Sequence, residues 1–312
     1  MIEARRLTRV YGGRPVVDAV TFTAEPGRVT GFLGLNGSGK TTTLRMLLGL
    51  VRPTSGVALV DGRPYRELVH PLRRVGAVVE QGACHPGQTG RAHLRTQAIL
   101  AGAGRARADL LLERVGLAEA ADRRAGGYSL GMRQRLSIAT ALLGDPPVLV
   151  LDEPGNGLDP AGIAWLRGLL RDHARAGGTV LVSSHLLAEV AQLVDDVVVI
   201  ARGRVLRQAP LARFTGAATP RVRVRGRDPQ RLWHVFTAAG ATVTADVGRL
   251  GHTPADVDRL DQARAGDQAL EVVGLTAEHL GELAFRAGVP VHELTPLARD
   301  VEQVFLDLVG PA

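Results

Sequence analysis

Lysine is almost absent from this chain. Lysine and arginine together make up 38 of its 312 residues, yet the only lysine is Lys40, within "GLNGSGKTTT". Such near-complete replacement by arginine indicates a compositional bias, so the net charge of +7 does not by itself predict a nucleic-acid partner. The denser run "RVRVRGR" is interpreted as one strand with a solvated arginine face. We therefore expect no nucleic acid among the partners.

Cysteine and long apolar runs are also scarce. The single cysteine, Cys84, excludes an internal disulfide and a cysteine-based metal cluster, and agrees with a reducing compartment. No window offers eighteen uninterrupted apolar residues, and the opening "MIEARRLTRVYGG" lacks the apolar core of a signal peptide. These absences predict a cytoplasmic chain. A length of 312 residues leaves room for one large α/β domain and a smaller one.

Short apolar runs alternate with helical patterns through the first two thirds of the chain, which is typical of parallel α/β architecture. "GRVTGFLGL" predicts a strand, and "GKTTTLRMLLGLV" predicts the helix that follows it. Three later runs also predict strands, with a helical segment "LLAEVAQLV" between the last two: "PPVLVLDEP", "GTVLVSSH" and "DDVVVIARGRVL". The opening segments 2–10 and 16–27 suggest antiparallel strands beside this core.

After Phe214 the pattern changes. "TGAATP" is a small-residue linker, so we expect one domain over 1–215 and a second over 216–312. The second domain reads as strand, helix, strand, strand, helix and strand, which resembles a split βαβ, ferredoxin-like module. The six elements are expected at 221–225, 230–239, 241–246, 269–274, 277–287 and 289–294, and a final helix at "ARDVEQVFLDLVG".

The stretch around Lys40 matches the P-loop pattern G-x-x-x-x-G-K-[ST], from Gly34 to Thr41, and it lies between a predicted strand and a predicted helix. Glycines let the backbone N–H groups turn inward around phosphate oxygens, and the helix start directs its positive end at the same anion. The Thr41 hydroxyl is the expected Mg²⁺ ligand. A lysine ammonium is a compact charge that fits inside such a loop, whereas a guanidinium is broad and planar.

Two acids, Asp152 and Glu153, end the buried strand "VLVLDEP". We expect this strand to lie beside the P-loop strand. Asp152 would then hold Mg²⁺ through water, and Glu153 would orient or deprotonate an attacking water.

Between the P-loop and these acids, "YSLGMRQRLSIATALL" predicts a second helix start. Ser129 and Gly131 there supply a hydroxyl and backbone N–H groups that could bind an anion. An ordinary N-cap explains the same residues equally well.

The order of P-loop, "SLGMRQR", "VLVLDEP", "GNGLDP" and "SSH" resembles the nucleotide-binding subunits of ATP-binding cassette (ABC) transporters, over residues 1 to 215. The resemblance implies a P-loop ATPase fold, with a mainly parallel core sheet, flanking antiparallel strands and a helical subdomain at about 82–145. It also implies ATP and Mg²⁺ as cofactors. A head-to-tail homodimer would enclose two ATP molecules, each held by the P-loop of one protomer and the signature residues of the other.

The resemblance assigns roles to individual positions. Lys40, Glu153 and His185 correspond to catalytic residues, and Asp159 to the aspartate that links the two sites across the dimer. Tyr11 corresponds to the aromatic that stacks on adenine, although a tyrosine on a strand face is the alternative. ATP contacts are expected from Tyr11, Gly34, Leu35, Asn36, Gly37, Ser38, Gly39, Lys40, Thr41 and Thr42, and trans contacts from Ser129, Gly131 and Met132.

Two motifs depart from the family pattern. The usual signature is leucine-serine-glycine-glycine-glutamine, whereas this chain has Tyr128 before Ser129, and Leu130 and Met132 around Gly131. The phosphate-facing serine and second glycine are kept, so hydrolysis of ATP to ADP and phosphate is still expected. The loop that usually begins with a glutamine has Glu80 at that position and Gln81 beside it, and either residue could serve Mg²⁺.

The closing segment "ELTPLARDVEQVFLDLVG" resembles the subunits of drug-export, bacteriocin-immunity and polysaccharide-export systems, in which the membrane permease is a separate chain. This favours an ATPase that powers export of a drug, an antibiotic or another hydrophobic compound from the cytoplasmic face of the plasma membrane. One alternative is a soluble ABC-type ATPase that acts on ribosomes or DNA, but such relatives usually carry two cassettes or a coiled-coil insertion. A nucleotide-regulated module without turnover is disfavoured by Glu153 and His185.

Overall fold

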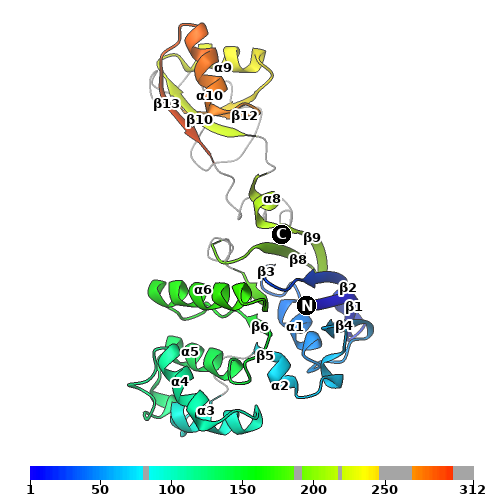
Figure 1. Cartoon of the computed structure of the whole chain (residues 1–312). Helices are drawn as coiled ribbons and strands as arrows, with labels where there is room; N and C mark the ends of the chain where they lie inside the picture. The colour runs from blue at the N-terminus through cyan, green and yellow to red at the C-terminus, as the bar shows by residue number, and fades with distance from the viewer. Residues whose placement is uncertain (80–83, 186–191, 217–219, 246–268, 298–312) are drawn as a thin grey trace. The chain divides into compact units, whose positions relative to one another are not determined.

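The computed structural model describes residues 1–79, 84–185, 192–216, 220–245 and 269–297. These residues divide into two compact units, one from Met1 to Phe214 and a second that begins at Thr215 (Figure 1). The final helix expected at 298–310, and most of the helix expected at 186–194, lie outside the described residues. Within them, no helix combines the length and apolar character needed to cross a membrane.

A six-stranded sheet forms the centre of the first unit, in the order β5-β6-β7-β3-β8-β9. Five of its strands are parallel and β9 pairs antiparallel with β8. Strands buried on both faces of a parallel sheet need continuous apolar runs, as "VLVLD" and "TVLVSS" supply. The strands are β3 (Val29–Leu33), β5 (Val75–Val78), β6 (Val148–Asp152), β7 (Thr179–Ser184), β8 (Asp196–Ala201) and β9 (Arg204–Pro210).

The order of the strands in this sheet shows that one prediction from the sequence was wrong. Strand β7 lies between β3 and β6, so the strand that ends in Asp152 is not the neighbour of the P-loop strand. Both candidate neighbours, β6 and β7, are short and mainly apolar, and the sequence alone does not distinguish their places in the sheet. The register still brings their ends together, because Leu33 pairs with Ser184 and Ser183 pairs with Asp152.

The run "DDVVVIARGRVL" is also more than the single strand predicted. It folds as the hairpin of β8 and β9, which turns at Arg202 and Gly203 with φ values of 49° and 78°. Positive φ at both positions is the requirement of the tight two-residue turn that matches the strand twist. The hairpin puts an antiparallel strand at one edge of the sheet.

A second sheet of three antiparallel strands has the order β2-β1-β4 and comprises β1 (Ile2–Tyr11), β2 (Arg14–Ala24) and β4 (Ser55–Val60). The first two strands were expected, and β4 was not. Helix α1 (Lys40–Leu47) contacts both this sheet and β6, and its buried face joins a core with Phe22 and Phe32. The P-loop helix is therefore enclosed between two sheets.

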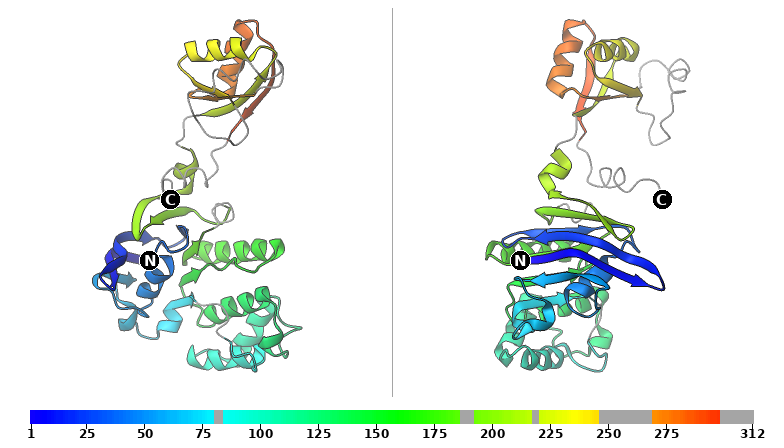
Figure 2. Two further views of the ribbon diagram at one scale, coloured as in Figure 1. Left: turned by 180° about the vertical axis from the view of Figure 1, so that it is seen from behind. Right: turned by 90° about the vertical axis from the view of Figure 1, so that its right-hand side faces the viewer.

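Three helices lie together on the far side of the unit from β1, β2 and β4 (Figures 1 and 2). They are α3 (Gly90–Leu100), α4 (Arg105–Arg114) and α5 (Leu130–Ala141), whereas α6 (Pro160–Arg175) packs on β3 and β7. The shorter segments are η1 (Tyr65–Glu67), α2 (Pro71–Arg74), η2 (Ala125–Gly127) and α8 (Leu211–Gly216). This arrangement confirms the expected fold class, with a mainly parallel core, antiparallel strands and a group of helices.

The second unit is a small α+β module, as expected. Its sheet has the order β11-β12-β10-β13, with every neighbouring pair antiparallel, and two helices cover a core that includes Phe236 and Leu280. This is the strand order of two interleaved βαβ units. The elements are β10 (Arg221–Gly226), α9 (Pro229–Ala238), β11 (Thr242–Ala245), β12 (Leu270–Val273), α10 (Ala277–Arg286) and β13 (Val291–Pro296).

The arginines of β10 alternate with buried valines, as predicted for one strand with an arginine face. Arg221 forms an ion pair with Glu271 on β12, and Arg225 lies 3.5 Å from Glu293 on β13. Glutamates on the neighbouring strands therefore offset part of the positive charge of this face.

Candidate functional site

The loop between β3 and α1 ends at Gly39, which has a left-handed conformation with φ of 102°. A Cβ atom at this position would lie 2.8 Å from the carbonyl oxygen of Val16, so the approach of β2 as well as the backbone angle requires glycine. No side chain caps the helix, and no acid occupies its first turn. The N–H groups at the start of α1 thus face an uncapped end, where the helix dipole favours an anion.

Lys40 is only 6% exposed, and its ammonium group lies inside the loop. Its Nζ donates to the carbonyl oxygens of Gly34 at 2.7 Å and Leu35 at 3.4 Å, and lies 3.4 Å from Glu153 Oε1. A buried charge needs partners of this kind, and a point-like ammonium can reach all three from one position. The loop tip, from Leu35 to Gly37, stays exposed.

Asp152 of β6 and Thr41 of α1 are in contact although β6 is not the neighbour of β3, the strand that leads to α1. Thr41 Oγ1 donates to Asp152 Oδ2 at 2.6 Å, and Ser183 of the intervening strand donates its hydroxyl to Asp152 Oδ1. Sequence reasoning did not select Ser183. Its only signal was its position two residues before His185, at the end of a buried strand.

Glu153 has φ of 49°, which is uncommon outside glycine. Its backbone N–H is held by the carbonyl and hydroxyl oxygens of Ser183, at 3.2 and 3.0 Å. His185 Nδ1 lies 2.8 Å from Glu153 Oε2. The carboxylate therefore lies between the ammonium of Lys40 and the imidazole of His185, which is the geometry of a positioned base with an orienting partner.

The residues of this site fit a magnesium nucleotide. The Ser38 hydroxyl is buried and has no hydrogen-bond partner among the described residues. Thr41 and Asp152 offer hydroxyl and carboxylate oxygens, the ligands that Mg²⁺ prefers. No group of three His, Cys, Asp or Glu side chains in the described part of the chain could enclose a metal by itself, so the remaining ligands would be phosphate and water oxygens. Glu80 and Gln81 lie outside the described residues.

Ser129 is exposed at the start of α5, where its hydroxyl accepts a hydrogen bond from the N–H of Met132 at 3.1 Å. Within one chain it is thus an N-cap. Gly131 and Met132 are half-buried in the same turn. Among the described residues of a single chain, Ser129, Gly131 and Met132 form no hydrogen bond with Lys40 or Glu153.

Tyr11 lies at the end of β1, and Asp159 lies directly before α6. Tyr11 ends β1 with 44% of its surface exposed, and the guanidinium of Arg9 lies 4.3 Å from its ring centroid. Asp159 caps α6, accepting a hydrogen bond from the N–H of Gly162 at 2.7 Å. Both side chains are exposed, and each has a local structural role in addition to the role implied by the family.

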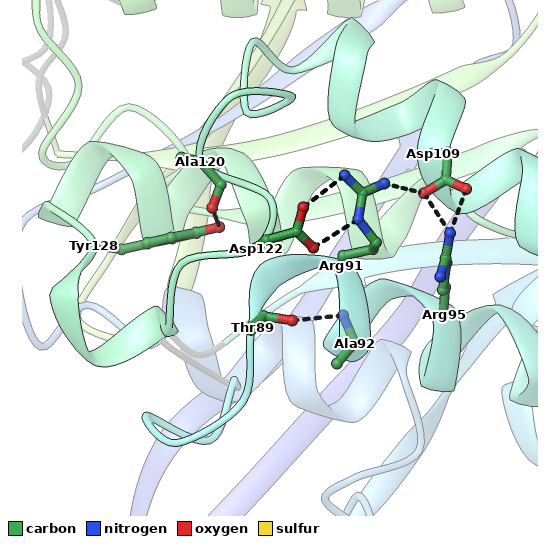
Figure 3. Close-up of polar contacts among 8 residues, drawn as sticks. All are labelled: Thr89, Arg91, Ala92, Arg95, Asp109, Ala120, Asp122 and Tyr128. Carbon is green, nitrogen blue, oxygen red and sulfur yellow. Dashed lines mark hydrogen bonds and ion pairs between the residues drawn. The ribbon is translucent and has the colours of Figure 1, made fainter.

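Ion pairs hold the helical part that carries Ser129 (Figure 3). Arg91 of α3 pairs with Asp122 at 2.9 Å and with Asp109 of α4 at 2.6 Å, and Arg95 pairs with Asp109 at 2.8 Å. The hydrogen bonds from Arg95 and Arg91 lower the pKa of Asp109, and the hydrogen bond from Arg91 lowers the pKa of Asp122. The network joins α3 and α4 to the segment that leads to Ser129.

Tyr128 precedes the signature serine and is 3% exposed. Its hydroxyl donates to the carbonyl oxygen of Ala120 at 2.6 Å (Figure 3). Its own carbonyl oxygen accepts from Arg133 at 2.6 Å. Burial raises the pKa of the Tyr128 phenol, so it remains a hydrogen-bond donor at neutral pH. The large side chain in place of the usual leucine thus anchors the start of α5.

Comparison with known proteins gives the family. Residues 17–156 match the ABC transporter family, and residues 220–302 match a domain of unknown function. The bacitracin transport ATP-binding protein of Bacillus licheniformis is 43% identical over 213 residues, which are 67% of this chain and 70% of that protein. The daunorubicin/doxorubicin resistance ATP-binding protein of Streptomyces peucetius is 34% identical and covers 99% of this chain and 92% of its own length.

Among solved structures, the dimeric form of a bacterial ABC transporter cassette superimposes with a TM-score of 0.62 at 26% identity, over 68% of this chain and 99% of that cassette. This confirms the fold that the order of motifs predicted. The first of these relatives is named for bacitracin transport and the second for drug resistance, and neither name supports the ribosome- or DNA-directed alternative. The chain belongs to the ABC transporter family, as an ATP-binding subunit with the ATPase domain of that family.

Proposed function

We propose that the triphosphate of ATP lies around Lys40 and that the adenine stacks on Tyr11. The uncapped start of α1, the buried ammonium and the unpartnered hydroxyl of Ser38 support this placement. Tyr11 is 44% exposed, which leaves part of its side chain accessible to a base. The other contacts proposed are the loop and helix positions Gly34, Leu35, Asn36, Gly37, Gly39, Thr41 and Thr42.

Mg²⁺ would be held by Thr41 and Asp152, with Glu80 or Gln81 as a further ligand. When bound, the ion would neutralise part of the charge that the phosphates carry. The hydrogen bond between Thr41 and Asp152 supports the pairing, since it keeps the two oxygen ligands adjacent.

Hydrolysis is assigned to Glu153, Lys40 and His185, and this arrangement is the observation that carries the proposal. Glu153 orients or deprotonates the attacking water, Lys40 stabilises the charge on the phosphate oxygens, and His185 keeps the carboxylate in place. The strained backbone of Glu153, tied to Ser183, fixes the direction of this carboxylate.

Two copies of the chain would enclose two ATP molecules. In this dimer Ser129, Gly131 and Met132 of one protomer cover the nucleotide on the P-loop of the other, and Asp159 links the two sites. The exposure of Ser129 and Asp159 in the single chain supports such a contact. Closure of the dimer by ATP is a population shift that the two bound γ-phosphates make favourable.

The work of this cycle is proposed to drive export of an antibiotic or another hydrophobic compound through a separate membrane permease. The chain would lie at the cytoplasmic face of the plasma membrane as a peripheral subunit. The two relatives named for bacitracin transport and for daunorubicin and doxorubicin resistance support a drug-like substrate. No nucleic-acid partner is part of this function.

Inverted membrane vesicles provide the test. The chain would be expressed with the six-span product that we expect from the neighbouring reading frame, and ATP-dependent uptake of doxorubicin would be measured. Uptake with the native chain and none with Glu153→Gln is the expected result. ATP hydrolysis without uptake of any hydrophobic antibiotic would overturn the drug-export assignment, and absence of hydrolysis would overturn the catalytic one.

A further inference from the structure

A buried hydrogen bond joins the signature helix to the loop that carries the catalytic carboxylate. Gln134 of α5 is 1% exposed, and its Nε2 donates to the carbonyl oxygen of Pro154 at 3.1 Å. Pro154 directly follows Glu153, and Gln134 lies five residues after Ser129 on the same helix. One side chain thus connects a helix that begins at the signature serine with the backbone beside Glu153.

The first turn of α5 makes a second contact with the same loop. Gly157 has φ of 77°, and a Cβ atom there would overlap the side chain of Leu130. A Cβ atom on Gly131 would in turn lie 2.8 Å from the carbonyl oxygen of Gly157. The helix and the loop are therefore packed without space for one methyl group at either position.

The loop itself is short and internally bonded. The N–H of Asn156 donates to the carbonyl of Glu153, and the N–H of Leu158 donates to the carbonyl of Gly155, both at 3.1 Å. Ser183 fixes the N–H of Glu153 at its start. A displacement of the loop by α5 can therefore be transmitted to the backbone of Glu153 instead of being lost within the loop.

We propose that Gln134 is a positioning residue that couples Ser129 to the Glu153 carboxylate within one protomer. The proposal rests on the proposed function, in which Ser129 contacts the nucleotide held by the partner. Contact of Ser129 with that nucleotide fixes α5, and α5 fixes the loop through Gln134 and through the packing of Leu130 on Gly157. Each protomer thereby aligns its own catalytic carboxylate only when its signature helix is engaged, and the coupling acts equally in the reverse direction.

The first test is a double-mutant cycle on the purified full chain. Gln134→Met keeps the length of the side chain and removes the donor, and Ser129→Ala removes the signature hydroxyl. Each single substitution is expected to lower kcat about 10-fold. The double variant is also expected to show a fall of about 10-fold, because both substitutions interrupt the same coupling between Ser129 and Glu153. ATP affinity of the P-loop, measured by calorimetry, should stay within about twofold. A double variant reduced about 100-fold would overturn the coupling.

Trp165→Phe is the matched control for the cycle. Trp165 Nε1 donates to the carbonyl oxygen of Arg114 at 3.2 Å, so it also joins α6 to the helical part through a side-chain N–H and a backbone carbonyl. The Trp165 ring also lies 4.9 Å from the guanidinium of Arg135 on α5, and phenylalanine keeps a ring there, so the substitution removes only the hydrogen bond to Arg114. In a chain that carries Trp165→Phe, Ser129→Ala should still lower kcat by the same factor. If Ser129→Ala no longer lowered kcat in that chain, a specific path through Gln134 would be contradicted.

A pair of glycine variants gives a second, independent test. Gly157→Ala and Gly177→Ala add a methyl group at similarly positive φ, 77° and 89°, but the methyl at Gly177 meets nothing within 4 Å. Gly157→Ala should lower kcat about 10-fold with ATP affinity retained, whereas Gly177→Ala should leave kcat within about twofold. Equal effects of the two variants would overturn the coupling. If the native chain itself hydrolyses no ATP, the proposed function fails and the coupling fails with it.

Discussion

Thr41 donates its hydroxyl hydrogen to Asp152 at 2.6 Å across the end of an intervening strand. Thr41 follows β3 and Asp152 ends β6, and β7 lies between them. Contact is possible because the carboxyl ends of parallel strands meet at one edge of the sheet, where ligand sites of open α/β sheets are found. Ser183 at the end of β7 completes the contact by donating to the same carboxylate.

Lys40→Arg keeps the positive charge but should weaken ATP binding. The ammonium is 6% exposed and satisfies two carbonyl oxygens and Glu153 from one point, which a planar guanidinium cannot do in the same volume. We expect ATP affinity to fall by at least about 10-fold, as for the loss of a charge-assisted hydrogen bond. Calorimetric titration with ATP measures this. Affinity equal to that of the native chain would contradict the role of Lys40.

Glu153→Gln should preserve ATP binding and stop hydrolysis. The amide has the shape of the carboxylate but does not accept a proton from water, so the ATP-bound dimer should accumulate. Light scattering with and without ATP measures the dimer. As a control, the same substitution combined with Lys40→Ala should remain monomeric. A monomer for Glu153→Gln itself in saturating ATP would argue against the dimer.

Ser183→Ala should lower both the stability of the fold and the response of the ATPase to Mg²⁺. The hydroxyl bonds both Asp152 and the N–H of Glu153. Its removal leaves Asp152 with Thr41, and the N–H of Glu153 with the carbonyl oxygen of residue 183, so loss of these two hydrogen bonds should destabilise folding by about 1–3 kcal/mol. We also expect the Mg²⁺ concentration for half-maximal ATPase activity to rise. Steady-state assays over a Mg²⁺ series measure this effect.

Thr30→Val is the control for Ser183→Ala. Thr30 is fully buried on the neighbouring strand β3, and its hydroxyl has no hydrogen-bond partner among the described residues. Its replacement should leave both stability and the Mg²⁺ response unchanged or slightly improved. A similar loss in both variants would mean that Ser183 acts only through packing.

Acid should weaken the ion pairs that hold the helical part. The pKa values of Asp109 and Asp122 are lowered in the folded chain, so their stabilising effect is present above the unfolded value of about 4 and is lost as pH falls through the folded values. Arg91→Gln should therefore lower the melting temperature at pH 7 and have less effect near pH 3.

Thermal melts at the two pH values measure the difference between native chain and Arg91→Gln. Arg175→Gln is the control, because Arg175 is exposed and, within the described part of the chain, pairs only with Asp172, one turn earlier on its own helix, at 3.5 Å. It should change the melting temperature little at either pH. An effect of Arg91→Gln that is the same at both pH values would contradict the proposed role of the carboxylates.

The sequence determined those parts of the site that are local in the chain. The P-loop needs a strand, a glycine-containing turn, one ammonium and a helix start within about a dozen residues, and each of these is visible as a residue type at a fixed spacing. The acids at the end of β6 and the histidine directly after β7 follow apolar runs that predict buried strands. Helix and strand periodicity likewise gave the six elements of the second unit in the right order.

Only the tertiary structure decided what depends on lateral position. The order of β3, β7 and β6, the role of Ser183, and the bond between Gln134 and Pro154 each join residues far apart in the chain. Two similar apolar strands could occupy each other's place in a sheet with the same sequence patterns. The sequence around a polar residue on a helix does not indicate which carbonyl oxygen its side chain will bond. Packing selects among these arrangements, because burial and hydrogen bonding must be satisfied for all elements together.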